Sequence, residues 1–206
     1  MASTLRHLLI QRAARLQDLP AFSAPEWGTL NYFQLRNRVE GVALGLMASP
    51  LPEAGFFAST NTPWDWICEV AAACCGLPWT VRGEPVVPEI LGGCRFNDEN
   101  GRQPYHDREE AVLETTPFLG ALSQAHWLQR LQRLNGELGW DHTSTVAVPM
   151  AALGTEGGRG ALWSALFAGG HARLVLAQKP TGFDRILGKR EREGWNPAPF
   201  QSLFSE

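Results

Sequence analysis

Short apolar runs alternate with segments of helical periodicity along nearly the whole chain. Runs such as Thr145–Pro149 have the length of buried strands, whereas Ser123–Leu138 places apolar residues at the spacing of one helix face. This alternation is typical of parallel strands joined by helical crossovers. We therefore expect an α/β fold in which a mainly parallel sheet is covered by helices.

The individual segments follow from periodicity and from start and stop residues. Thr62, Pro63 and Asp65 form a strong helix start, because a proline in the first turn loses no hydrogen bond and an aspartate faces the positive helix end. The expected helices span residues 4–16, 31–46, 62–75, 123–138, 161–168 and 183–193. The expected strands span residues 20–24, 55–59, 77–81, 111–114, 145–149 and 173–176. Turns are expected at residues 25–28 and 154–160, and one further helical turn within 197–206.

Size and composition point to one domain. The chain has 206 residues, and 44% hydrophobic against 19% charged residues allow a substantial core. Residues 82–110 are rich in glycine, proline and charge, so we expect a long irregular connection there. The net charge of -3 and the scattered basic residues predict neither a nucleic-acid groove nor binding to an anionic membrane surface. No apolar run approaches the roughly 20 residues of a membrane span, and no secretory signal is evident, so we expect a cytoplasmic protein.

Cysteines and tryptophans are the residue types whose placement bears most on a site. Cys68, Cys74, Cys75 and Cys94 lack paired C-x-x-C spacing, so we interpret them as small buried residues rather than metal ligands or disulfides. The five histidines show no metal-ligand spacing either. Eight tryptophans are many for this length, and core packing and an aromatic-lined pocket or partner surface both remain open.

Several local motifs occur in the order and spacing of a known family. Residues 19–22 and 28–35 read L-P-A-F … G-T-L-N-Y-F-Q-L, close to the pattern P-A-hydrophobic … T-Y-x-E-L. Residues 58–66 resemble a strand-to-helix turn N-S-x-E-W, and 71–79 resemble a helix-to-strand stretch A-x-x-x-A-G-A-x-x-x-P. Matches to P-L-x-H … L-L-x-G-G-x-x-V-L and to the helix after it lie in residues 146–150, 163–170, 174–176 and 183–187. Together the motifs resemble the N-terminal portion of adenylate-forming enzymes, the acyl-CoA synthetases and AMP-dependent ligases.

The ATP-binding loop of that family is where the chain departs from the resemblance. The family cradles the ATP phosphates with a Ser/Thr/Gly-rich loop that ends in Pro-Lys-Gly and leads into a helix with a Ser/Thr-His pair. Here no lysine follows Pro117, Phe118 and Leu119 are apolar, and Glu114 carries charge of the same sign as a triphosphate. The residues that align as degenerate remnants of the nucleotide loop are Thr115, Thr116, Gly120 and His126. We therefore expect no ATP binding in the family's manner.

The resemblance also implies where a carboxylate substrate would bind. In the family, the turn after the strand predicted at 145–149 borders the carboxylate pocket, so Met150, Ala151 and Ala152 are possible pocket residues. The glycines of 154–160, with Arg159, allow an anion nest at the following helix start, although a plain turn is the favoured interpretation.

The function implied is that of a ligase-like N-terminal domain without ligase activity of its own. We read residues 1–206 as a single truncated domain that acts as a binding or partner module. Its partners would be a second copy, a full-length ligase or another protein, with an acyl or aryl acid as a possible ligand. No catalytic residue, metal site or cofactor is expected. The alternative is one half of a split acyl- or aryl-adenylate ligase, completed by a second chain and using ATP with Mg²⁺; a gene product without selected function is a third possibility.

Overall fold

A computed structural model describes residues 2–48, 61–77, 110–115, 117–119, 122–176 and 196–204. Several predictions fall outside these residues and are not tested by the structure. They concern the strand at 55–59, most of the strand at 77–81, most of the irregular connection at 82–110, Thr116, Gly120, Cys94 and the helix at 183–193.

In the described part of the chain, the central sheet has four strands in the order β2-β1-β6-β5. Their bounds are Pro20–Ala24 for β1, Gly28–Asn31 for β2, Thr145–Pro149 for β5 and His171–Val175 for β6. β6 pairs in parallel with both β1 and β5, whereas β1 and β2 form an antiparallel hairpin. The sheet is thus mainly parallel, and the predicted fold class is confirmed.

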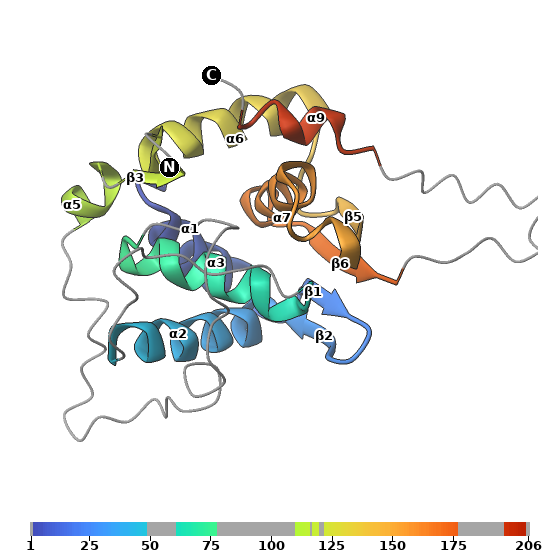
Figure 1. The fold of residues 1–206 in the computed structure, drawn as a ribbon, viewed down its shortest axis with the longest axis horizontal. Coiled ribbons are helices and arrows are strands. Elements are labelled where there is room, and N and C mark those ends of the chain that lie inside the picture. Colours follow the sequence, from blue (N-terminus) through green and yellow to red (C-terminus); the bar gives the residue numbers. More distant parts are fainter. Residues whose placement is uncertain are drawn as a thin grey trace, which may run out of the picture.

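Helices pack on this sheet in two groups (Figure 1). α2 (Tyr32–Ala48) packs against β1 and β2, and it also contacts α1 (Leu5–Leu16) and α3 (Pro63–Cys75). α7 (Glu156–Ala168) packs against β5 and β6, and α6 (Gln124–Leu138) and the short α9 (Ala198–Gln201) lie against α7. α9 is the helical turn predicted for the tail.

Local capping explains why most predicted helices form where expected. The side chain of Asn31 accepts a hydrogen bond from Gln34 N at 2.8 Å, while Gln34 Oε1 accepts one from Asn31 N at 3.0 Å, so the two form a capping box before α2. The Ser123 side chain caps α6 by accepting from His126 N. α3 ends at Gly76, whose φ of 67° is the left-handed conformation in which glycine is favoured.

Four predictions about local structure need correction. No strand was predicted between the turn at 25–28 and the helix at 31–46, yet Gly28–Asn31 form the strand β2, whose first residue Gly28 has a φ of 66°. Residues 111–114 are not a strand but belong to the helix α5 (Glu110–Thr115), in which Leu113 is fully buried. Residues 154–160 are not a flexible turn, because α7 already begins at Glu156. β5 was predicted to be buried, yet in the described sheet it is the last strand, and only its Val148 is fully covered.

The core accounts for the cysteines and for half of the described tryptophans. Cys68, Cys74 and Cys75 are buried in α3, which confirms their interpretation, and burial raises the pKa of the Cys68 thiol to about 12. The buried tryptophans are Trp66, Trp127 and Trp163, and the half-buried ones are Trp27, Trp64 and Trp140. No helix within the described ranges is both long and apolar enough to cross a bilayer.

Candidate functional site

A short hairpin precedes α6 at the position where the nucleotide loop is expected. β3 (Pro117–Leu119) pairs antiparallel with β4 (Leu122–Ser123), and Leu119 lies opposite Leu122. Only two residues therefore connect the strands. Of the predicted remnants, Thr115 is the exposed last residue of α5, and Thr116 and Gly120 lie outside the described residues.

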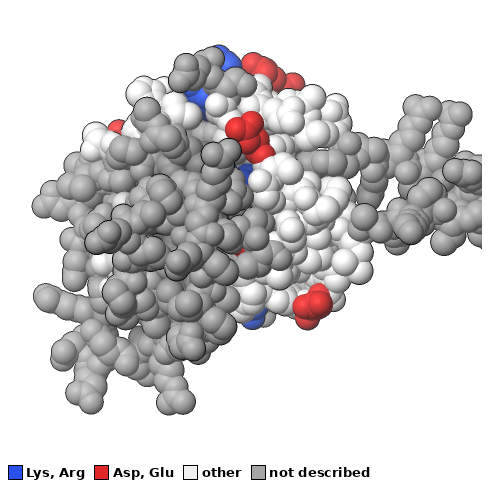
Figure 2. Space-filling view, viewed as in Figure 1, with Lys and Arg blue, Asp and Glu red and all other residues white. Residues whose placement is uncertain are grey.

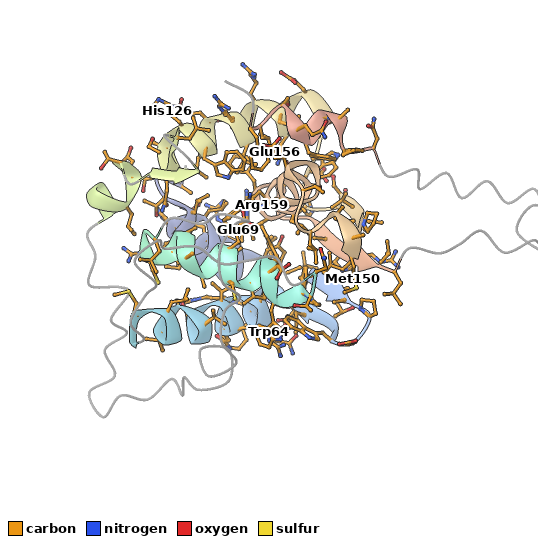
Figure 3. All side chains as sticks on the ribbon, in the orientation of Figure 1. Trp64, Glu69, His126, Met150, Glu156 and Arg159 are labelled. Carbon is orange, nitrogen blue, oxygen red and sulfur yellow. The ribbon has the colours of Figure 1, made fainter. Side chains whose placement is uncertain are left out.

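His126 is the predicted remnant whose surroundings the structure describes best. It lies in the first turn of α6, exposed, with its Nδ1 atom 3.1 Å from the Oγ atom of Ser123. Figure 3 shows His126 on α6, well separated from Met150. The structure therefore does not bring His126 together with the predicted pocket residues.

Met150, Ala151 and Ala152 form a short 3-10 helix, η2, directly after β5. Met150 and Ala152 are half-buried, whereas Ala151 is exposed. Because β1, β5 and β6 run in parallel, η2 lies at the edge of the sheet where all three strands end. In open α/β sheets this carboxyl edge is where ligands bind, so η2 is placed where a pocket residue would be. Their role as pocket residues stays a prediction.

An aromatic group at the same edge was not predicted as a unit. Trp27, in the turn that follows β1, meets Trp64 at the start of α3 edge-on, with ring centroids 4.6 Å apart. The guanidinium carbon of Arg38, from α2, lies 4.4 Å from the Trp27 ring centroid and 5.6 Å from that of Trp64. This contact combines cation–π attraction with burial of the arginine stem. It ties the hairpin turn to α2 and α3.

The start of α7 closes tightly against its neighbours. A Cβ atom added to Gly158 would lie 2.0 Å from the carbonyl oxygen of Ala152, and one added to Gly157 would lie 2.4 Å from Cβ of Pro197. The Gly158 amide donates to Thr155 Oγ1 at 3.1 Å as part of the helix cap. The glycines therefore serve close packing of η2 and of the segment 196–204 on α7, and the Gly158 amide is already used by the cap.

Arg159 points into the protein and pairs with Glu69 of α3 (Figure 3). Its Nε donates to Glu69 Oε2 at 2.8 Å and its Nη2 to Oε1 at 2.9 Å, and Trp163 Nε1 donates to Oε1 at 2.7 Å. The side chains of Arg159 and Glu69 are only 6% and 3% exposed. With its charge bound in this bidentate pair, Arg159 has no role in an anion nest, and its contribution is to join α3 and α7.

A cavity of about 530 Å³ lies where α1, α6 and α7 end. Its wall includes Arg12, Arg15, Asn135 and His142. Arg12 Nη2 donates to the carbonyl of Phe167 in the last turn of α7, and burial lowers the pKa of the Arg12 guanidinium. Because helix C-terminal ends carry partial negative charge, this arginine acts as a cap on α7. Within the described ranges, no three His, Cys, Asp or Glu residues come together as a metal site.

Charged side chains of both signs occur on the surface. Figure 2 shows blue and red atoms separated by mostly white surface on the described part of the face drawn.

Solved structures resemble this arrangement of sheet and helices. The chain has the fold of the N-terminal subdomain of an adenylation enzyme. The N-terminal subdomain of Klebsiella oxytoca NpsA, in complex with 3-hydroxybenzoyl-AMSN, aligns with a TM-score of 0.58 at 13% identity, covering 87% of this chain and 55% of that one. An artificially fused adenylation-PCP di-domain of the same organism, NpsA-ThdA, aligns with a TM-score of 0.57 at 16% identity, covering 88% of this chain and 44% of that one.

The comparisons support the fold expected from the motifs, and at such low identity they support the fold alone. A third NpsA subdomain structure, in space group P21, gives a TM-score of 0.54 at 16% identity. The chain spans about half the length of the solved structures that it matches. No protein-family model and no curated protein matches the sequence.

Proposed function

We propose that the chain is a non-catalytic module of the adenylation-enzyme fold, which acts by binding a protein partner and forms no adenylate on its own. The observation that carries this proposal is the β3–β4 pairing in front of α6. With Leu119 opposite Leu122, two connecting residues remain where a phosphate loop would need a run of free backbone amides.

The charges around this hairpin support the same conclusion. Glu114 is exposed at the end of α5, close in sequence to the hairpin, and Phe118 and Leu119 supply no hydrogen-bond donor from their side chains. Arg159, the cation nearest in sequence to the predicted pocket residues, is bound to Glu69. The lysine that would follow Pro117 in the family is missing from the sequence, and catalysis of phosphoryl chemistry requires fixed positive charge.

The test is calorimetric titration of ATP with Mg²⁺ into the purified chain, followed by titration of aryl and acyl carboxylic acids. We expect no heat of binding for ATP, whereas binding of a carboxylic acid without ATP would show that the chain has a ligand pocket. Micromolar ATP binding would refute the proposal. Pyrophosphate exchange that arises only when a second chain is added would replace it with the split ligase.

A further inference from the structure

A short segment that follows the sheet and its helices in the sequence packs on α7. It spans residues 196–204 and contains α9, which lies against α7 (Figure 1). We call it the α9 segment. Its side chains Phe200 and Leu203 are only 5% and 1% exposed, and Phe204 follows directly. The three are spaced i, i+3 and i+4, so they share one face of a helical segment.

Two glycines of α7 make room for the α9 segment. Gly157 and Gly160 lie about one turn apart in the helix. A Cβ atom added to Gly157 would lie 2.4 Å from Pro197 Cβ, and one added to Gly160 would lie 2.7 Å from the carbonyl oxygen of Phe200. For both glycines, the three atoms nearest to the added Cβ belong to the α9 segment. The close approach at these two positions is therefore made by this segment.

Aromatic rings cover the other side of the segment. The Phe204 ring meets the fully buried Trp127 of α6 edge-on, with centroids 5.0 Å apart. The Phe200 ring lies 5.4 Å from that of Trp140, which follows α6. Apolar anchors at i, i+3 and i+4 on such a surface are typical of an amphipathic helix bound in a groove. We call the surface that receives the segment the α9-binding face; its residues are Trp127, Trp140, Gly157 and Gly160.

We propose that the α9-binding face is a docking site between copies, at which two chains exchange their α9 segments. This inference rests on the proposed function, because it names the partner of the module as a second copy of the chain. Exchange can keep the contacts described above, since segment and face are the same in both copies. The 19 residues 177–195 precede the segment, and a chain of that length spans up to about 60 Å, enough to reach a neighbouring copy.

Two complementary variants test docking between copies. Gly160→Leu blocks the face, because its side chain would take the space of the α9 segment, and it should keep α7 because leucine favours a helix over glycine. The double variant Phe200→Ala with Leu203→Ala removes two anchors of the segment and leaves the face unchanged. We expect sedimentation velocity to show a monomer for each variant alone. The mixture should contain a heterodimer, because the intact segment of the first variant can dock on the intact face of the second.

A labelled peptide of residues 196–204 measures docking without a second chain. In fluorescence anisotropy, it should bind the double variant at least about tenfold more tightly than the unaltered chain, whose own segment occupies the face. The matched control is Phe33→Ala, which removes a 54% exposed phenylalanine of α2 and should bind the peptide as weakly as the unaltered chain.

The unaltered chain supplies a measurement that does not depend on the folding of any variant. Copies labelled at the N-terminal amine with donor or acceptor dyes should show energy transfer after mixing and incubation. An excess of unlabelled peptide should abolish this transfer, because it competes for the α9-binding face.

Three outcomes would overturn the proposal. They are the absence of heterodimer from a mixture of variants that each unfold cooperatively in urea, equal peptide binding by the double variant and the unaltered chain, and energy transfer that is absent or insensitive to the peptide. Peptide binding without heterodimer would give the face to another protein with a Phe-x-x-Leu-Phe segment and would refute exchange between copies. The ATP titration is independent of these measurements, so failure of the exchange leaves the non-catalytic assignment intact.

Discussion

Breaking the buried ion pair between α3 and α7 should cost more stability than any other single polar change in the described core. Arg159→Met removes two of the three donors to the Glu69 carboxylate and leaves that charge with Trp163 Nε1 alone. Both side chains are nearly inaccessible, at 6% and 3% exposure, so water cannot replace the lost donors. Removing one partner of such a pair costs about 3–5 kcal/mol.

Restoring neutrality should recover most of this loss. In the double variant Glu69→Met with Arg159→Met, no charge is left buried, and apolar side chains of similar volume fill the site. Such replacements are often neutral or stabilising, by about 1–4 kcal/mol. The double variant should therefore be more stable than either single variant, although it lacks more of the native contacts.

The assay is urea unfolding monitored by tryptophan fluorescence, with the free energy of unfolding as the measured quantity. The matched control is Arg133→Met, which breaks the exposed 3.6 Å pair with Glu137 and should cost less than about 1 kcal/mol. A cost below about 1 kcal/mol for Arg159→Met would refute the reasoning, as would a double variant whose loss equals the sum of the two single losses.

Three further predictions concern single positions. Gly158→Ala should destabilise the chain by about 1–3 kcal/mol, because the added Cβ would lie 2.0 Å from the Ala152 oxygen. Gly136→Ala should instead stabilise the chain by about 0.5–1 kcal/mol, because a Cβ at this position of α6 meets open space. Thermal unfolding of the two variants measures both effects. Burial lowers the pKa of His171 below its usual 6.5, so the unfolded chain binds the proton more tightly than the folded chain. The free energy of unfolding should therefore fall as the pH drops below about 6.5. Urea unfolding at several pH values should show a smaller fall for His171→Gln. Burial raises the pKa of Cys68 to about 12, so at pH 8 its thiol should not react with a thiol reagent until urea is added. The measurement uses the Cys94→Ser variant. Labelling of Cys68 in the native chain would contradict the prediction.

Elements with their own start and stop signals were predictable from the sequence. α3 begins after Thr62 and ends at Gly76, and α6 is capped by Ser123, as the residues indicated. In each case the deciding interactions lie within a few residues of the chain, so no knowledge of the fold is needed.

Elements decided by distant contacts were not predictable. Three apolar residues in a row, 111–113, fit a strand or a helix equally well, and α5 is helical with Leu113 buried. The glycines of α7 suggested a turn, but Gly157 and Gly158 are needed there because the segment 196–204 and η2 approach too closely for a side chain. The signal for a helix, the Thr155 cap with Glu156 in the first turn, was present and was outweighed by the glycines.

In the candidate site, too, residues that follow a local motif could be predicted and residues brought together by distant contacts could not. Met150–Ala152 could be placed from a motif, since they follow a recognisable strand. Trp27, Arg38 and Trp64 come from a turn and two different helices, and nothing in the local sequence of any one of them indicates the other two. Only the packing of α2 and α3 beside the β1–β2 hairpin brings them together.

The position of Arg159 bears on how much positive charge a ligand would meet at the carboxyl edge of the sheet. An arginine four residues after the Thr155 cap would favour anion binding if its side chain faced the edge, because it would add a full charge to the positive helix end. Here Glu69 neutralises that charge inside the core, and Glu156 adds a carboxylate to the first turn instead. Among the described residues at this edge, Arg38, stacked on Trp27, is a cation near the ends of the strands. The described part of the edge thus offers aromatic surface and the Arg38 guanidinium, a combination that suits a carboxylate.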